Sequence, residues 1–315
     1  MANTYIPPPN DKLSDFLEAL VPVKYKGTDR FLDIVTWNLR WFHGRDPERV
    51  TRIVEIMDAI SADIFVLQEV KEGSLTDVST RLVASGAGHY ETQYGTTGGD
   101  QRVAIMYDLD WIRAKSPIEE LFGRGAVRTR DGKDAFPRLP LVGHFGCLSP
   151  GQDPYDFQLM GLHLKSQMGD GSPQRRLAAS KLASWLTRDA AQVDSDVIML
   201  GDWNAPPQAP EWRPIRTLET TKRAAFRTLN ETGEISYLMY KNRASIGTRI
   251  DLAIVSTASL PRLHGRPQVI QWRSLVELLA RSPSAREIES FIRELGTMVS
   301  DHMPLVARFY FAEPE

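Results

Sequence analysis

The stretch Asp196-Val197-Ile198-Met199-Leu200-Gly201-Asp202-Trp203-Asn204 joins an apolar run of strand length to a glycine and two small oxygen-bearing side chains. The run predicts a buried β-strand. A strand that ends in Gly-Asp-x-Asn brings a carboxylate and an amide to the rim of a sheet, where open α/β sheets tend to bind ligands. Taken alone, the stretch fits a strand followed by an ordinary turn at least as well, because Gly, Asp and Asn are common turn residues.

Strands and helices are predicted to alternate on both sides of this stretch. Apolar runs predict strands at residues 31–38, 63–67, 103–107, 157–162, 249–255 and 305–311. Amphipathic periodicity predicts helices capped by Asp46, by Ser172 and by the capping box Ser284-x-x-Glu287, the last of which should end at Gly296. Residues 91–100 and 123–134 are expected to form loops.

The alternation continues without a break in composition, which argues for one α/β domain. Residues 31–315 are expected to form this domain, with an insertion around residues 257–299. Residues 1–30 are expected to be an N-terminal extension, made of a proline-rich tail and a short helix that starts at Asn10 or Asp11 and runs to Leu20.

Composition restricts the class of protein. A hydrophobic content of 42% with 25% charged residues is typical of a globular protein, and no apolar stretch is long enough to cross a membrane. The net charge of -2 gives no bulk basic character, so charge alone neither supports nor excludes a nucleic-acid partner. The single cysteine, Cys147, rules out an intramolecular disulfide, and no signal peptide is visible, so a cytoplasmic location is expected.

Six apolar runs border a polar residue of catalytic or ligand type. Each residue alone has a structural interpretation, such as a strand cap, a surface charge or a hydrogen-bonded core histidine. Their joint occurrence is much harder to attribute to chance. The residues are Asn38, Glu69, His163, Asp202 with Asn204, Asp251, and Asp301 with His302.

These residues and their neighbours resemble the endonuclease/exonuclease/phosphatase superfamily, which has the fold of pancreatic deoxyribonuclease. The resemblance covers nearly the whole chain, from residue 31 to residue 311, and is closest in style to the deoxyribonuclease and bacterial nuclease branch. The motifs that carry the resemblance are Trp37-Asn38, Leu67-Gln68-Glu69, Gly161-Leu162-His163-Leu164-Lys165-Ser166, Gly201-Asp202-Trp203-Asn204, Arg249-Ile250-Asp251 and Ser300-Asp301-His302-Met303-Pro304. Weaker matches are Gln101-Arg102 and Phe136-x-Arg138-x-Pro140.

The resemblance implies an α/β fold of four layers, in which two mixed sheets pack face to face with helices on both outer faces. The site would lie at one rim of this sandwich. Asn38, Glu69 and Asp301 would supply hard oxygen ligands, which suit Mg²⁺, with Mn²⁺ or Ca²⁺ as possible substitutes.

The resemblance also implies the catalytic roles. Asp202, beside Asn204, would orient and deprotonate the attacking water. Asp251 would hold His302 in one tautomer, so that His302 can donate to a phosphoryl oxygen or carry a proton. His163 would contact the phosphate from the other side, and sequence does not decide which histidine is the acid and which the base.

The expected reaction is metal-dependent, in-line attack of water on a phosphate ester. A nuclease that acts on DNA or RNA is the first expectation, because His163 followed by Lys-Ser looks like the deoxyribonuclease branch. The alternative is a phospholipid or small-molecule phosphodiesterase or phosphatase of the same superfamily, and a silent binding module is disfavoured because all eight site residues are present. Candidate phosphate contacts are Arg102, Arg138, Lys165 and Arg40, for each of which structural pairing is an equal alternative.

Overall fold

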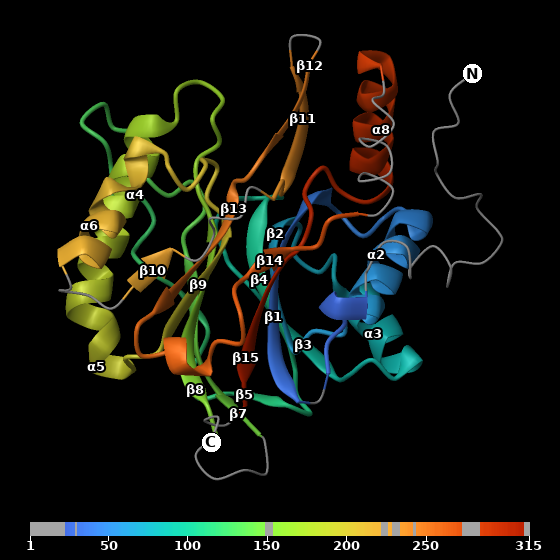
Figure 1. The fold of residues 1–315 in the computed structure, drawn as a ribbon, viewed down its shortest axis with the longest axis horizontal. Helices are drawn as coiled ribbons and strands as arrows, with labels where there is room; N and C mark the ends of the chain where they lie inside the picture. Colours follow the sequence, from blue (N-terminus) through green and yellow to red (C-terminus); the bar gives the residue numbers. More distant parts are fainter. Residues whose placement is uncertain are drawn as a thin grey trace.

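The computed structural model describes residues 23–28, 30–148, 154–221, 226–228, 234–241, 244–272 and 284–311. In these residues two large mixed sheets face each other, and helices cover both outer faces (Figure 1). The predicted four-layer α/β class is therefore confirmed. The helix predicted to start at Asn10 or Asp11 lies outside the described residues.

The first sheet has the strand order β14-β15-β1-β2-β4-β3. Only its central pair, β1 with β2, is parallel. Its strands β1, β2 and β4 are almost continuously buried because the second sheet covers one face and helices cover the other. Their bounds are β1 (Phe31–Phe42), β2 (Ile64–Val70), β3 (Tyr90–Tyr94), β4 (Arg102–Asp108), β14 (Gln268–Val269) and β15 (Leu305–Tyr310).

The second sheet has the order β10-β13-β9-β8-β7-β5, with β6 paired to β7, and its parallel pair is β8 with β9. The two sheets lie close together at Gly161, where an added Cβ would lie 2.8 Å from Val66 Cγ1 and 2.9 Å from Val103 Cγ1. The strands are β5 (Ile112–Ala114), β6 (Glu119–Glu120), β7 (Leu141–Cys147), β8 (Asp156–His163), β9 (Val197–Asp202), β10 (Phe226–Thr228) and β13 (Asp251–Ser256).

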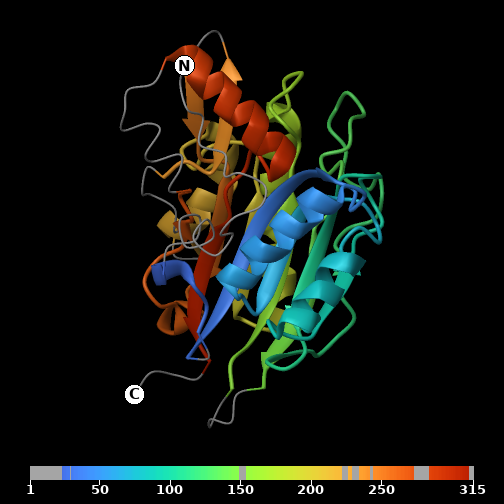
Figure 2. The same ribbon diagram turned by 90° about the vertical axis from the view of Figure 1, so that its right-hand side faces the viewer.

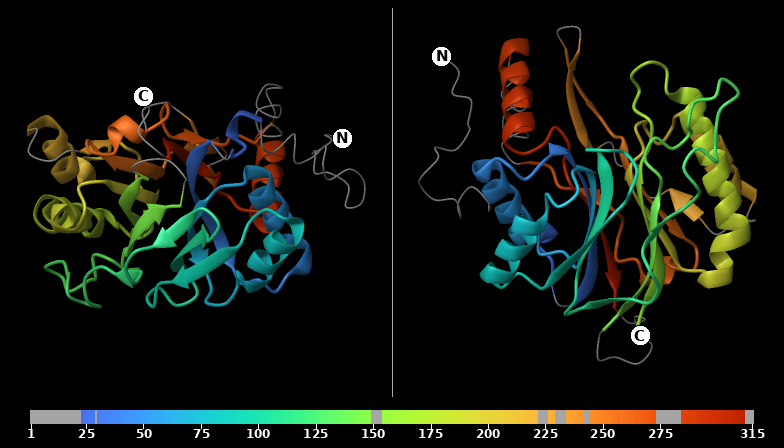
Figure 3. Two further views of the ribbon diagram at one scale, coloured as in Figure 1. Left: turned by 90° about the horizontal axis from the view of Figure 1, so that it is seen from below. Right: turned by 180° about the vertical axis from the view of Figure 1, so that it is seen from behind.

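Helices α2 (Pro47–Ile60) and α3 (Thr76–Ser85) cover the first sheet, and Figure 2 shows them in front of it. The second sheet is covered by α4 (Ser172–Trp185) and α6 (Arg213–Thr221), which lie on the opposite side in Figure 3. The π-helical turn η2 (Leu186–Ala190) and α5 (Ala191–Val193) continue α4. Short 3-10 turns are η1 (Val23–Tyr25), η3 (Pro210–Trp212) and η4 (Leu260–Arg262).

Two predicted helix starts are confirmed and one is wrong. Asp46 caps α2 by accepting from two backbone N–H groups, and the capping box of α8 (Ala285–Met298) forms between Ser284 and Glu287. In α4 the N-cap is Gly171 and Ser172 is already helical, because the chain turns into the helix one residue earlier. Helix α8 also continues past Gly296 to Met298.

Two predicted strand boundaries are wrong as well. The strand predicted to stop at Asn38 continues to Phe42, because it resumes pairing with β2 after a bulge. Most of the residues 91–100, expected to form a loop, stay irregular, but residues 91–94 belong to β3. The alternating burial of Tyr90 to Tyr94 and their antiparallel pairing with β4 outweigh the glycine and threonine content nearby.

The β11–β12 hairpin (Tyr237–Lys241 and Ala244–Thr248) and α8 rise from one end of the sandwich (Figures 1 and 3). Tyr237 at the base of this hairpin bridges to His302, so the base of the hairpin lies beside this histidine. None of the described helices is long and apolar enough to span a membrane.

Candidate active site

The carboxyl ends of the two parallel strand pairs bring most of the predicted site residues together. In the second sheet His163 on β8, Asp202 on β9 and Asp251 on β13 lie directly opposite one another in register. In the first sheet Asn38 on β1 lies opposite Gln68, next to Glu69. Because the sheets face each other, the two sets of strand ends meet at one rim.

Asp202 lies at the centre of this group and is buried. Its Oδ2 accepts a hydrogen bond from Asn38 Nδ2 at 3.0 Å, and its Oδ1 accepts one from the backbone N–H of Asn204 at 2.9 Å. The Nε2 atoms of His163 and His302 lie 3.6 and 3.9 Å from Oδ2. Burial raises the pKa of Asp202 to about 7, although the charge of His302 acts to lower it. The carboxyl group can therefore gain or lose a proton near neutral pH.

His302 is fixed from three directions. Its Nδ1 pairs with Asp251 Oδ2 at 2.9 Å, its carbonyl oxygen accepts from Trp37 Nε1 at 3.0 Å, and the ring of Tyr237 lies 4.6 Å away. Burial alone would lower the pKa of His302, but Asp251 first, and then Asp202 and Asp301, raise it to about 10. The imidazole is therefore held as a cation whose free Nε2 side faces Asp202.

His163 has the opposite protonation state. It is fully enclosed, and burial, with further contributions from Arg138 and His302, lowers its pKa well below the ordinary value. Its Nε2 lies 3.8 Å from Glu69 Oε1, and its buried Nδ1 has no hydrogen-bond partner among the described residues. One neutral and one cationic imidazole thus flank the same carboxylate.

The oxygen-bearing residues predicted to bind metal lie on the first-sheet side of Asp202. Glu69 occupies the bulge between β1 and β2 with a φ of 57°. Its Oε1 accepts from Asn38 Nδ2 at 3.3 Å and its Oε2 from the backbone N–H of Trp41 at 3.1 Å. Burial, and to a smaller extent the charge of Glu69, raise the pKa of Asp301, while His302 and Arg40 oppose the shift.

These donors fit a divalent cation, because two carboxylates and an amide are a hard oxygen set. Ligation by Asn38 would use Oδ1, the atom that accepts the backbone N–H of Arg40 at 2.9 Å. A tighter group at the same rim is formed by Asp202, Asp251 and His302, whose ligand atoms all lie within 4.8 Å of one another. The hydrogen bond between His302 and Asp251 accounts for much of that proximity.

The four predicted phosphate contacts are in different environments. Arg40 Nε lies 3.5 Å from Asp301 Oδ2, and Arg138 is buried behind His163 with Nη2 on the carbonyl oxygen of Leu164 at 3.0 Å. Lys165 Nζ donates to Ser166 Oγ and to the carbonyl oxygen of Met168. The Arg102 guanidinium is held by two loop carbonyl oxygens and by Glu72 Oε2 at 2.9 Å.

A buried ion pair that the sequence did not predict holds the loop that follows His163. Arg175 on α4 donates through Nη1 to the carbonyl oxygens of Lys165 and Ser166 at 2.9 and 3.0 Å, and through Nη2 to Glu211 Oε1 at 2.8 Å. It therefore ties the loop after His163 to the loop after Asn204. A lone arginine in a helix gives no sequence signal for such a role.

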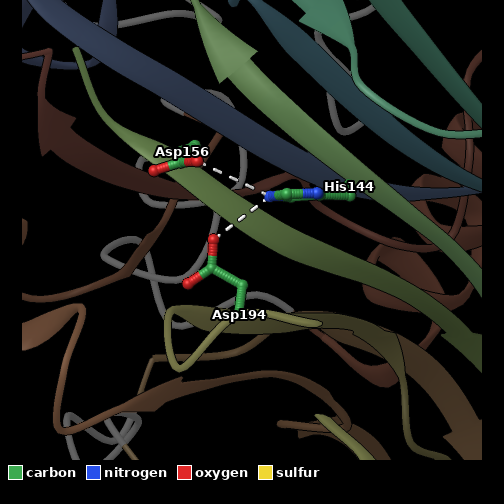
Figure 4. Close-up of side chains that lie close together, drawn as sticks. All are labelled: His144, Asp156 and Asp194. Carbon is green, nitrogen blue, oxygen red and sulfur yellow. Dashed lines mark hydrogen bonds and ion pairs between the residues drawn. The ribbon is translucent and has the colours of Figure 1, made fainter. Parts of the chain in front are cut away.

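A second cluster of possible ligand residues lies far from this rim. His144 Nε2 is 3.1 Å from Asp194 Oδ2 and 3.7 Å from Asp156 Oδ2 (Figure 4). Asp156 begins β8, whereas His163 ends it, so the cluster is at the other end of the strand. Lys115 already forms an ion pair with Asp156, which makes a structural role sufficient for this cluster.

Solved structures similar to this chain share its fold. An endonuclease/exonuclease/phosphatase family protein from Bacteroides thetaiotaomicron has 18% identity and a TM-score of 0.60, covering 89% of this chain and 98% of that one. The mannosyl-6-phosphatase Bt3783 of the same species has 17% identity and a TM-score of 0.56, with coverage of 88% and 98%. D. rerio TDP2 complexed with single strand DNA product has 15% identity and a TM-score of 0.55, with coverage of 89% and 99%.

The fold is shared by proteins of a family whose name joins nucleases and phosphatases. The sequence profile of the Endonuclease/Exonuclease/phosphatase family matches residues 35–302, and the chain belongs to this family. The predicted resemblance is therefore confirmed. None of the curated protein sequences compared with the chain is a significant match.

Proposed function

We propose that the chain is a divalent-metal-dependent phosphodiesterase that hydrolyses DNA or RNA. The observation that carries this proposal is the position of the Asp202 carboxylate, which lies 3.6 and 3.9 Å from the Nε2 atoms of His163 and His302, with His163 Nε2 also 3.8 Å from Glu69 Oε1. A phosphoryl group placed between the two imidazoles would meet one cationic donor and one neutral nitrogen.

The residues of the chain have separable tasks in this proposal. Asp202 orients a water molecule and accepts its proton, because its carboxylate lies at the centre of the group and its pKa is about 7. His302, held as a cation by Asp251, donates to a phosphoryl oxygen and stabilises the charge that develops there. His163 contacts the phosphate from the other side, and Asn204 fixes Asp202 through its backbone N–H.

Glu69, Asp301 and Asn38 would hold the ion, for which Mg²⁺ is the proposed physiological choice. When bound, the ion would polarise the phosphate and neutralise charge on it. Arg40, Arg102, Arg138 and Lys165 are retained as proposed phosphate contacts, and Arg40 is the best placed because it lies beside Asp301.

The test is a substrate panel with purified protein and Mg²⁺ or Mn²⁺: plasmid DNA, single-stranded DNA, RNA, bis-p-nitrophenyl phosphate, a sugar phosphate and sphingomyelin. Nicking or degradation of nucleic acid that disappears in His163→Ala and in EDTA is expected. The mannosyl-6-phosphatase among the structural neighbours makes the sugar phosphate a necessary arm. Turnover confined to the sugar phosphate or to sphingomyelin would replace the nuclease assignment by the alternative of the same family.

A further inference from the structure

A cavity of about 670 Å³ lies beside the candidate active site, on the side of β1. The end of β1, the loop that follows it and the start of α2 form one wall, and Gly296 and Thr297 of α8 contribute to the other. Two lining residues also contact the site, since Arg40 Nε is 3.5 Å from Asp301 Oδ2 and the Trp41 N–H donates to Glu69. The volume is within the range of about 300–1,000 Å³ of small-ligand pockets.

The backbone that lines this cavity is strained. Arg40 and Trp41 have φ values of 45° and 50°, in the left-handed region that residues with a Cβ rarely adopt. Such a residue costs about 1–3 kcal/mol and persists where its surroundings hold it. Here Arg49 Nη2 donates to the carbonyl oxygens of Leu39 and Arg40, and Asn38 Oδ1 accepts from the Arg40 N–H.

The side chains of these two strained residues both line the cavity. Trp41 is 52% exposed. Arg40 lies against α8, where a Cβ on Gly296 would lie 1.8 Å from Arg40 Nη1. Gly296 lies near the C-terminal end of α8, and the absence of a Cβ at this position makes room for the arginine.

The charge of the lining favours an anionic occupant. Four cationic side chains and two aspartates line the cavity. One of the aspartates, Asp46, is occupied as the N-cap of α2, and the other, Asp100, lies 3.5 Å from Lys71 in a pair that is substantially exposed. Exposed pairs of this kind are weak, so Lys71 remains free to meet a ligand phosphate.

We propose that this cavity binds the nucleotide next to the scissile phosphate, with its base stacked on Trp41 and its own phosphate beside Arg45 and Lys71. The inference rests on the proposed nuclease function and names the residues that would recognise the substrate. An exposed aromatic ring beside cations suits a nucleotide, because bases of every sequence stack on aromatic side chains. Helix α8, part of the predicted insertion, would thereby shape the substrate site.

Binding can be measured without turnover. The probe is a fluorescein-labelled single-stranded DNA 12-mer, titrated in EDTA with wild-type protein, Trp41→Ala, Trp41→Phe and Gly296→Ala, and followed by fluorescence anisotropy. Removal of one stacking ring is expected to weaken binding by about tenfold, within the range known for base stacking. Trp41→Phe should retain most of the affinity, and Gly296→Ala should weaken binding because it displaces Arg40.

Leu109→Ala is the matched control, because Leu109 is another exposed apolar side chain, at the turn after β4 and away from the site. Arg45→Ala should reduce the slope of log affinity against log salt concentration by about 0.7, the value for one phosphate contact on a single strand. Circular dichroism of each variant separates lost binding from lost folding.

Wild-type affinity in both Trp41→Ala and folded Gly296→Ala would overturn the inference, even if the wild-type protein degrades DNA. Absence of DNA binding by the wild-type protein would overturn it too. Trp41-dependent binding of sphingomyelin vesicles in place of DNA would overturn the nucleotide assignment. If DNA binding depends on Trp41 but no phosphodiester is hydrolysed, the proposed function fails, and the cavity stands as a nucleotide site without a scissile phosphate beside it.

Discussion

Replacement of Arg175 by lysine tests whether the buried pair behind the site positions catalytic groups. Arg175 and Glu211 are each 5% exposed, and Arg175 reaches the carbonyl oxygens of Lys165 and Ser166 as well as Glu211. Lysine keeps the positive charge but lacks the planar fork of donors, so a single ammonium group cannot satisfy all three acceptors. We expect the ammonium to stay with Glu211 and the loop carbonyls to lose their donor.

The expected magnitude follows from the bonds that are lost. A hydrogen bond to a charged group is worth about 1.5–3 kcal/mol, so loss of the loop contacts should reduce the free energy of unfolding by roughly that amount. Every 1.4 kcal/mol of transition-state stabilisation that is lost lowers kcat/KM about tenfold. We therefore expect kcat/KM for a diester substrate to fall at least about tenfold, by the same conversion. KM should rise more than kcat falls if Lys165 binds phosphate.

The assay is steady-state hydrolysis of bis-p-nitrophenyl phosphate with Mg²⁺, together with urea unfolding. Arg308→Lys is the matched control, because Arg308 donates to Asp33 Oδ1 at 2.6 Å and to the carbonyl oxygen of Lys26 at 2.8 Å, near the start of β1 and away from the strand ends. The Arg308→Lys variant should show a similar loss in the free energy of unfolding but keep the wild-type kcat and KM. In a Lys165→Ala background, Arg175→Lys should cause almost no further loss of kcat/KM, since both residues act through one loop. Equal losses of kcat/KM in Arg175→Lys and Arg308→Lys would refute a positioning role.

Three further predictions concern the fold, the histidine and the metal. Gly161→Ala should lower the free energy of unfolding by about 1–3 kcal/mol, because its Cβ would press on Val66 and Val103 of the facing sheet; an unchanged urea midpoint would contradict this. Asp251→Asn should lower the pKa of His302 from about 10, since Asp251 is the largest influence that raises it. The pKa can be measured from the imidazole resonances by NMR in metal-free buffer, and an unchanged pKa of His302 would contradict the prediction. Glu69→Gln should weaken Mg²⁺ binding in calorimetry relative to the exposed control Glu91→Gln, and equal affinity would exclude Glu69 as a ligand.

The sequence predicts well those features that depend on neighbouring residues. Apolar runs located most of the long strands, and the caps of α2 and α8 follow from local hydrogen-bonding rules. The polar residues that end these runs also meet in space, because parallel strands place their carboxyl ends at the same rim. The metal and phosphate roles of these residues remain predictions, which the titrations and variants above address.

Contacts between distant residues were beyond sequence reasoning. Arg49 holds the end of β1 and also donates to the carbonyl oxygen of Val299, and Arg175 meets a glutamate on a different loop. Such pairs depend on the completed topology and leave no periodicity or motif in the chain. The short edge strand β3 was missed for a related reason, because its pairing with β4 decided a segment of weak local preference.

The distribution of backbone strain ties these long-range contacts to the site. Of the seven non-glycine residues with positive φ in the described part of the chain, four lie at the candidate site: Arg40, Trp41, Glu69 and Asn204. Each is held by a hydrogen bond from or to another site residue. Asn38 and Glu69 accept from the Arg40 and Trp41 N–H groups, Glu69 accepts from Asn38 Nδ2, and the Asn204 N–H donates to Asp202 Oδ1. Strain of this kind costs stability and persists only where the surrounding structure fixes it. The strand ends are therefore held in their strained geometry by the same side chains that are proposed to carry the chemistry.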